Sequence, residues 1–330
     1  MADSTRRIFT SWLAAAAAGI TPVSVFAQSA KPAPAAPAMP RLRIVIPANE
    51  GGGWDQTGRA LGAAMTASGA VAQVEYENIG GKGGTIGLAR YVEKYDADPD
   101  AVLMSGMVMV GAVALQKPAV DMSRIAPLAR LTSDYEVVVV KGDSPIVTAK
   151  DLIAKMRADP ASTAIAGGSA GGIDHMFAGI LARAAGNTAA LVYQPFPGGA
   201  QVVSAVESGK AVAGISGYSE FSEHIASGKL RAIGVSSRNA FMGVPSVRQQ
   251  GVDADLANWR GVFTGKAVPA PRQAILLDAV RRAVATDVWQ KAIKRSNWDN
   301  YWMEGKDFQG FLDLDQSMAG VLTYILKLKS

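Results

Sequence analysis

Cysteine is absent from this chain of 330 residues, and histidine occurs only twice. Without cysteine the protein forms no disulfide bonds, and two histidines without a spaced carboxylate partner do not make a metal site. Only 18% of the residues are charged and 49% are hydrophobic, which is the composition of a folded protein. The net charge of +5 is modest and no long Lys/Arg run occurs, which argues against a nucleic-acid partner. We therefore expect neither a metal nor a cofactor.

The amino-terminal residues have the pattern of an export signal. Arg6 and Arg7 precede an apolar, alanine-rich stretch at 8–20, and small residues at 25–27 provide a cleavage site. We predict a signal peptide over residues 1–27 and a Pro/Ala-rich linker over 28–40. The two arginines also fit the twin-arginine pattern, and an ordinary Sec signal is the alternative. No later segment is long and apolar enough for an anchor, so export leads to the periplasm or the exterior, and of these we expect the periplasm.

Alternating strand and helix patterns predict an α/β fold with two similar lobes. Buried-type strands are expected at 42–47, 71–78, 101–105, 135–141, 161–166, 191–194, 211–215, 230–236 and 259–264. Helices are expected at 57–66, 85–94, 149–158, 174–185, 200–208, 220–227, 273–285, 289–295 and 307–328. We assign residues 41–139 and 255–330 to lobe 1 and residues 140–254 to lobe 2. Ligands bind in the cleft of such folds, where strand carboxyl ends meet helix amino ends.

Glycine-rich loops precede four of the predicted helices. They lie at Gly51–Arg59, Gly80–Gly87, Gly167–Gly172 and Pro197–Gly199. Backbone N–H groups at a helix amino end bind anions, because they point outward and lie at the positive end of the helix dipole. The loop around Lys82 lacks the spacing of a phosphate-binding or dinucleotide-binding motif. We therefore expect a small anionic ligand.

The predicted site combines these loops with nearby hydroxyls and one aromatic residue. Trp54 is expected either to belong to the core or to form an apolar wall over a ligand, and Asp55 to cap the first helix through its carboxylate. Lys82 is either an extra cation of the site or a solvated loop residue. The predicted ligand-binding residues are Gly52, Gly53, Trp54, Asp55, Lys82, Gly83, Gly84, Ser105, Ser169, Ala170, Gly171, Gly172, His175, Pro197, Gly198, Gly199 and Ser216.

An enzymatic alternative rests on Gly167-Gly168-Ser169-Ala170-Gly171, which matches the G-x-S-x-G nucleophile elbow. A serine hydrolase also needs a histidine base held by an acid. His175 lies too near to Ser169 in the chain, and His224 has only Asp174 or Glu207 as candidate acids. The match arises easily by chance in a chain with 35 glycines. We therefore favour a binding protein without catalytic residues.

Several motifs together resemble the receptors of tripartite tricarboxylate transporters, also called the Bug family. The first loop, GGGWDQT at 51–57, is similar to the form found in the branch associated with citrate and related acids. The resemblance continues, in order along the mature chain, at 77–78, 83–87, 168–175, 193–199, 214–218 and 228–233.

This resemblance implies a two-lobed Venus flytrap receptor that delivers a carboxylate to a membrane permease. It also implies that backbone N–H groups, hydroxyls and waters hold the ligand, without a salt-bridging arginine. We expect the receptor to be a monomer. Glu50 and Lys82 depart from the family pattern, and we expect them to shift the ligand preference away from simple citrate.

Overall fold

The computed structural model describes residues 39–329. The predicted signal peptide 1–27 lies outside these residues. So does the predicted linker, except for its last two residues, which begin the first strand. The strands are β1 (Met39–Ile46), β2 (Val71–Asn78), β3 (Ala101–Gly106), β4 (Ile125–Lys141), β5 (Ile165–Gly167), β6 (Tyr193–Pro195), β7 (Ala213–Gly217), β8 (Leu230–Val235), β9 (Ala257–Gly265) and β10 (Asp299–Glu304).

Helices alternate with these strands, as the sequence pattern predicts for an α/β fold. None of the helices within residues 39–329 has both the length and the apolar character that a membrane span requires. The helices are α1 (Gly53–Ala67), α2 (Thr85–Tyr95), α3 (Met107–Gln116), α4 (Ala149–Ala158), α5 (Ile173–Ala184), α6 (Gly199–Glu207), α7 (Tyr218–Ala226), α8 (Ala270–Val284), α9 (Asp287–Arg295) and α10 (Gly305–Ile325).

The strands form one mixed sheet in the order β2-β1-β3-β9-β4-β7-β5-β6, with β8 and β10 also paired to β4. β1 runs parallel to β2 and β3, and β5 runs parallel to β6 and β7. β9 is antiparallel to both β3 and β4. We call β1, β2, β3, β9 and β10 the first strand group, and β5 to β8 the second strand group.

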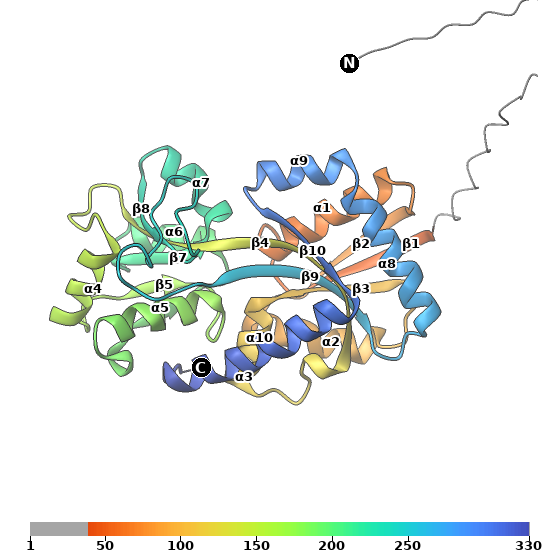
Figure 1. Cartoon of the computed structure of the whole chain (residues 1–330), viewed down its shortest axis with the longest axis horizontal. Coiled ribbons are helices and arrows are strands. Elements are labelled where there is room, and N and C mark those ends of the chain that lie inside the picture. The colour runs from red at the N-terminus through yellow and green to blue at the C-terminus, as the bar shows by residue number, and fades with distance from the viewer. Residues whose placement is uncertain (1–38, 330) are drawn as a thin grey trace, which may run out of the picture. The chain divides into compact units, whose positions relative to one another are not determined.

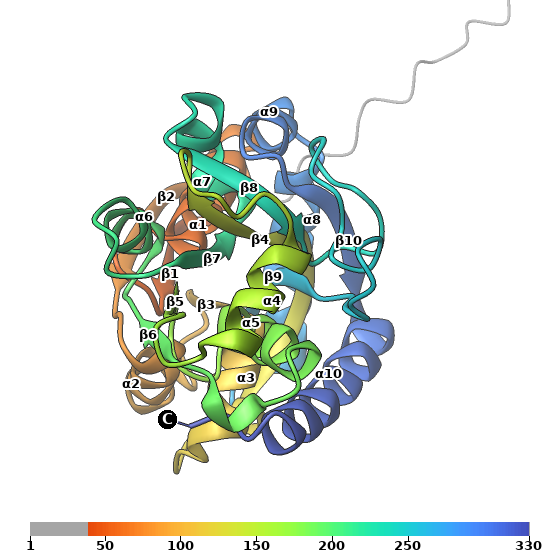
Figure 2. The ribbon, with the colours of Figure 1, turned by 90° about the vertical axis from the view of Figure 1, so that its left-hand side faces the viewer.

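The long strand β4 joins the two strand groups. Its residues 125–135 pair with β9, whereas residues 136–141 pair with β7 and β8. Figure 1 shows β4 and β9 running side by side from one group toward the other. The four valines at 137–140 are fully buried, as expected for a strand covered on both faces. Figure 2 shows this covering, with α4 and α5 on one side of the second group and α6 and α7 on the other.

The carboxyl-terminal helices pack on elements that lie far away in the sequence. α8 and α9 contact α1, and α10 contacts α3 and β4. The ring of Phe308 on α10 meets the ring of Trp259 on β9 edge to face, with 5.7 Å between the centroids. Beyond α10, the side chains of Leu326 and Leu328 lie against Gly179 of α5. The end of the chain therefore reaches from the first strand group to the second.

Two elements differ from the sequence prediction. The apolar stretch at 107–116 forms α3, which was not predicted because it lacks an amphipathic period and is largely buried. The stretch at 299–304 forms β10, which pairs antiparallel with β4, so the tail does contribute a strand. In addition, α1 begins at Gly53 rather than Thr57, which places its amino end within the triple glycine.

Close packing at the end of β3 gives a testable prediction. A Cβ atom on Gly106 would stand 2.2 Å from the Trp259 carbonyl oxygen, so the Gly106→Ala variant forces two backbone segments apart. We expect it to lower the free energy of unfolding by about 1–3 kcal/mol in urea titrations. The control is Gly310→Ala on α10, where a Cβ meets nothing within 4 Å and alanine raises the helix propensity. Equal stability of the two variants would contradict this packing.

Candidate functional site

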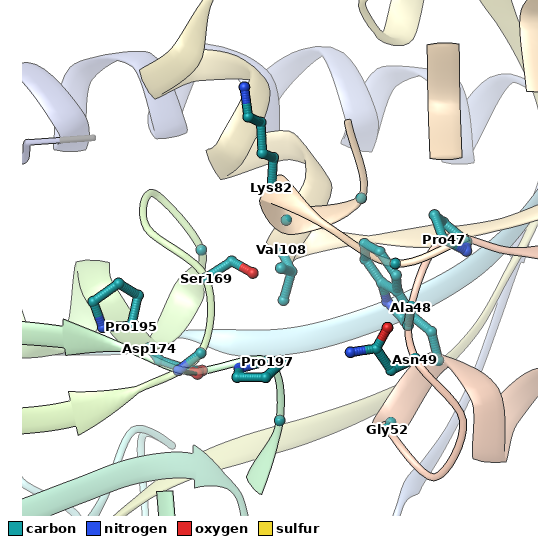
Figure 3. Close-up of a pocket in the computed structure, with 18 of the residues that line it drawn as sticks. Pro47, Ala48, Asn49, Gly52, Lys82, Val108, Ser169, Asp174, Pro195 and Pro197 are labelled. Carbon is teal, nitrogen blue, oxygen red and sulfur yellow. Dashed lines mark hydrogen bonds between the residues drawn. The ribbon is translucent and has the colours of Figure 1, made fainter. Parts of the chain in front are cut away.

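A cavity of about 880 Å³ lies between the two strand groups. Figure 3 shows Ser169, Asp174, Pro195 and Pro197 on one side of it, opposite Pro47, Ala48 and Asn49. Twelve of the predicted site residues line this cavity, which brings all four glycine loops together. They are Gly52, Gly53, Trp54, Lys82, Gly83, Gly84, Ser169, Ala170, Gly172, Pro197, Gly198 and Ser216.

Four helices begin at the cavity wall with a glycine at the N-cap position. These N-caps are Gly52 for α1, Gly84 for α2, Gly172 for α5 and Gly198 for α6, and none of them provides a side-chain cap. The first N–H groups of a helix have no partner within the helix, and a side-chain cap normally takes up one of them. A glycine cap leaves these donors to solvent, to a ligand or to other side chains, and the first N–H of α6, at Gly199, donates to Glu220. The cavity is therefore surrounded by the positive ends of helices.

The α2 loop reaches the cavity because it is built from left-handed residues. Lys82, Gly83 and Gly84 have φ values of 49°, 67° and 90°. The ring of Trp54 fills the space beside Gly84, where a Cβ atom would stand 2.6 Å from Trp54 Cζ3. A larger residue at 84 would therefore push the indole out of its place. Trp54 is buried in the core and also lines the cavity.

Two predicted residues near the first loops lie outside the cavity lining. The Asp55 carboxylate does not cap α1; it accepts hydrogen bonds from the Gly51 N–H, Arg59 Nε and Asn78 Nδ2, each at 2.9 Å. Asp55 thus stabilises the conformation of the glycine loop without lining the cavity. Ser105 is fully buried, and its hydroxyl donates to Met109 Sδ at 3.2 Å. Its hydroxyl is therefore directed at a neighbouring side chain and not at the cavity.

Three further predicted residues also lie outside the lining. The Gly171 N–H donates to His175 Nδ1 at 3.1 Å, and the His175 ring stacks on Tyr193 with centroids 4.1 Å apart. Burial lowers the pKa of His175 to about 4, so this imidazole is neutral at physiological pH. The Gly199 N–H donates to Glu220 Oε1 at 3.4 Å. These groups support the loops through contacts that the sequence pattern does not reveal.

Ser169 lacks the partners of a catalytic serine. Figure 3 shows its hydroxyl directed into the cavity. His175 is occupied by Gly171 and Tyr193, and His224 lies 3.8 Å from Glu207 on α6, at a half-exposed site outside the cavity lining. A nucleophile needs a base within hydrogen-bond reach, and neither histidine provides one. Ser169 is therefore suited to bind a ligand as a hydroxyl group.

The two departures from the family pattern have different positions. The Glu50 side chain is 79% exposed, lies 3.5 Å from Arg59 and is outside the cavity lining. Glu50 therefore does not face a ligand in the cavity directly. Lys82 is among the residues that line the cavity, and Figure 3 shows its side chain pointing away from Ser169 and Asn49. Its ammonium group extends toward solvent.

A buried arginine, which was not predicted, lies at the cavity. Arg260 on β9 is 1% exposed, and its Nη2 lies 3.2 Å from Asp134 Oδ2 on β4. Its Nη1 donates to Thr57 Oγ1 at 3.3 Å. A Cβ atom on Gly53 would stand 2.7 Å from Nη2, so the guanidinium lies directly beside the amino end of α1. The cavity thus contains an arginine whose charge is paired with a protein carboxylate.

Carboxyl groups line the opposite wall of the cavity. Asp174 accepts from the Gly168 N–H at 2.5 Å, and Glu220 accepts from the Ser216 hydroxyl at 2.5 Å. Burial raises the pKa of Asp174 to about 6. Burial and the neighbouring Asp174 raise the pKa of Glu136, which lies behind the wall, well above its usual range. The buried carboxyl groups at this wall therefore lie in an environment that disfavours their charged forms.

Several lining residues were not among the predicted site residues, for identifiable reasons. Three lie on α3, the helix that was missed. Asn258 and Arg260 lie within β9, where a buried-strand pattern hides them, although a charge inside such a strand is itself a signal. The residues are Pro47, Ala48, Asn49, Gly80, Gly81, Val108, Leu115, Gln116, Gly168, Asp174, Pro195, Phe196, Glu220, Asn258 and Arg260.

The chain is similar to known proteins over most of its length. The family model described as tripartite tricarboxylate transporter family receptor matches residues 62–323. The protein BugT of Bordetella pertussis is 28% identical over 251 residues, which are 73% of this chain and 75% of BugT.

Two solved structures show the same fold. The periplasmic binding protein BugD has a TM-score of 0.79 at 20% identity, covering 88% of this chain and 98% of BugD. The R. palustris protein Rpa4515 with adipate has a TM-score of 0.80 at 17% identity, covering 88% of this chain and 98% of that one.

The buried imidazole gives a prediction for stability against pH. The folded-state pKa of about 4 lies below the ordinary value of 6.5, so the unfolded chain binds more protons between these values. The wild type therefore loses stability as the pH falls through this window. Relative to His175→Asn, which keeps an acceptor for Gly171, we expect an additional loss on the order of 2–3 kcal/mol between pH 7.5 and 4.5. Parallel urea-unfolding curves of both proteins at the two pH values measure it. Equal losses would mean that His175 titrates normally.

Proposed function

Because the chain belongs to the tripartite tricarboxylate transporter receptor family, we propose that its cavity captures a small di- or tricarboxylate in the periplasm. The bound acid is then delivered to the membrane permease of a tripartite tricarboxylate transporter. The chain is a solute-binding protein and not an enzyme, in keeping with its family and with the absence of a base beside Ser169 in the described residues.

The convergence of four uncapped helix amino ends on one cavity carries this proposal. The amino end of α1, between Gly52 and Trp54, binds one carboxylate together with Gly83 and Gly84. The loop 169–172 and Gly198 bind the other end of the ligand. Ser169 adds a hydroxyl donor. A chain of four to six carbons with a carboxylate at each end fits such a pair of opposed anion sites, and Rpa4515 with adipate is a relative in fold.

Lobe closure is the proposed mechanism of capture. We assign residues 41–139 and 255–330 to one lobe and 140–254 to the other, joined through β4 and β9. The cavity draws its lining from both sides, so a ligand that contacts both favours the closed arrangement. The register irregularities of β4, between Pro127 and Ala129, Arg130 and Thr132, and Val138 and Val139, are suitable points for bending.

Export to the periplasm is part of the proposal. The pattern of residues 1–27 supports it, and the twin-arginine and Sec routes are both compatible with Arg6 and Arg7. BugD, which shares the fold, is a periplasmic binding protein. We propose that the receptor acts there as a monomer.

Ligand-dependent thermal stability tests the function. A ligand that binds only the folded state stabilises it by mass action, by about 2.7 kcal/mol at a concentration 100 times the dissociation constant. We expect at least one of adipate, malate and citrate, or a close relative of these acids, to raise the melting temperature by several degrees. Neutral analogues such as the corresponding diamides serve as controls and are expected to have no effect. A panel of carboxylic acids in which none shifts the melting temperature would contradict the receptor function.

The Ser169 hydroxyl provides a second test. Removing a hydrogen-bond donor to a charged group costs about 1.5–3 kcal/mol, so Ser169→Ala is expected to weaken the best acid by about ten- to a hundredfold in calorimetric titrations. The matched control is Ser204→Ala on α6, an exposed serine outside the cavity lining. The wild type should hydrolyse no generic ester. Ester turnover that disappears in Ser169→Ala would instead support a hydrolase.

A further inference from the structure

A second cavity lies beside the loop that carries Ser169. Its volume is about 260 Å³, and it lies between the segment 188–195 and the end of the chain. Ala170 and Pro195 line this cavity as well as the larger one, so the two cavities share part of a wall. At roughly 30 Å³ for each water in the liquid, the second cavity has room for about eight waters. It is therefore large enough to hold a small organic molecule.

The end of α10 forms one side of the second cavity. Lys327 follows the helix with a φ of 52°, and the N–H of Leu328 donates to the Thr323 carbonyl oxygen at 3.2 Å. This is the Schellman arrangement, which turns the chain back at the end of a helix. The leucines on either side of Lys327 then lie against Gly179 of α5, and Figure 1 shows the end of α10 close to α5. Residues 326–329 thus close the cavity on the side of α10.

The imidazole of His175 provides a hydrogen-bond donor in this cavity. His175 lines the cavity and is only 4% exposed. Its Nδ1 accepts from the Gly171 N–H, so the proton of the neutral ring lies on Nε2. Within residues 39–329 no group accepts a hydrogen bond from Nε2, and this atom is not sealed inside the protein. The Nε2–H group is therefore available to an occupant of the cavity.

The remaining lining combines an apolar surface with positive charge. Lys327 and Lys329 line the cavity and are exposed, Thr188 adds a hydroxyl, and no Asp or Glu of the described residues belongs to the lining. Water is a poor occupant of such a cavity, because an ordered water needs about two to four polar partners. The apolar lining residues are Ala170, Leu191, Tyr193, Pro195, Leu326 and Leu328.

We propose that this cavity is a second ligand site, which binds a small monocarboxylate with an apolar body. The carboxylate accepts from His175 Nε2–H, and the ammonium groups of Lys327 and Lys329 compensate its charge. The apolar body packs against the leucines of the lining. A dicarboxylate does not fit this pattern, because its second charge would lie against apolar side chains. The inference goes beyond the proposed function and does not depend on which acid the larger cavity takes.

Monocarboxylates of increasing length test the chemistry of the site on the full-length mature protein. The probes are acetate, butyrate, hexanoate and benzoate, titrated at pH 7.5 with ligand-observed NMR, and hexanamide and benzamide are the neutral controls. We expect hexanoate or benzoate to bind at least about tenfold more tightly than acetate, because the longer body buries more apolar surface. The amides should not saturate. Acetate that binds as tightly as the longer acids, or no saturable binding by any acid, would overturn the inference.

Variants connect this binding to the second cavity. His175→Asn keeps an acceptor for Gly171 but shortens the side chain, and we expect it to weaken the best monocarboxylate by about tenfold or more. The matched control is His224→Asn, at the only other histidine of the chain, which is half-exposed and lines neither cavity.

A second variant changes only exposed side chains and leaves the buried contacts intact. The double variant Lys327→Gln, Lys329→Gln is expected to weaken the monocarboxylate by about two- to fivefold. Its matched control is Lys306→Gln, an exposed lysine at the start of α10 that lines neither cavity. An affinity that neither His175→Asn nor the double lysine variant changes would overturn the inference.

A brominated probe locates the site and separates this inference from the proposed function. In crystals soaked with 4-bromobenzoate, we expect the anomalous signal of bromine between residues 188–195 and 326–329. A bromine found only in the larger cavity would overturn the inference while leaving the carboxylate receptor intact. A panel of di- and tricarboxylates without any shift of the melting temperature would contradict the receptor function, whereas the second site is judged by the monocarboxylates alone.

Discussion

The buried guanidinium of Arg260 connects several of the elements that surround the cavity. It extends from β9, pairs with Asp134 on β4, donates to Thr57 on α1 and lies over the ring of Trp298, 4.9 Å from its centroid. Breaking a buried ion pair by removing one partner costs about 3–5 kcal/mol, because it leaves an uncompensated charge. Strands β4 and β9 and helix α1, which carries the first glycine loop, thus meet at this guanidinium. The close approach of Gly53 and Gly217 to this region explains why neither position has a side chain.

The chemical character of the rest of the site depends on how positive and negative groups are distributed around the cavity. Helix amino ends surround the cavity with N–H donors, and their glycine caps carry no side chain that could accept from them. The opposite wall carries the carboxyl groups of Asp174 and Glu220, and Asp134 and Glu136 lie buried nearby. The cavity is therefore dipolar and not uniformly positive. A binding protein with such a cavity selects its ligand by the placement of charge as well as by the number of carboxylates.

Much of this arrangement can be predicted from the sequence, and the remainder has physical reasons for being missed. Glycine loops that precede helices can be recognised from a short stretch of sequence. The segments around Gly52, Gly83 and Ser169 were assigned to the site in this way, and they line the cavity. The direction of a side chain depends on tertiary contacts that the local sequence does not reveal. The Ser105 hydroxyl donates to Met109, and the Asp55 carboxylate accepts from the Gly51 N–H. Helix α3 shows no amphipathic alternation of apolar and polar residues, because it is largely buried. Arg260 and Asn258 appear as interruptions of a buried strand, and only the tertiary pairing with β4 gives them partners.

The most direct test of the central claim is a crystal structure of the protein with its tightest-binding acid. We predict that a ligand carboxylate lies within hydrogen-bond distance of the backbone N–H groups at the start of α1, with the other end of the ligand at the loop 169–172 and Asp174. A ligand bound elsewhere on the molecule, or held in the cavity without contact to any helix amino end, would contradict the account.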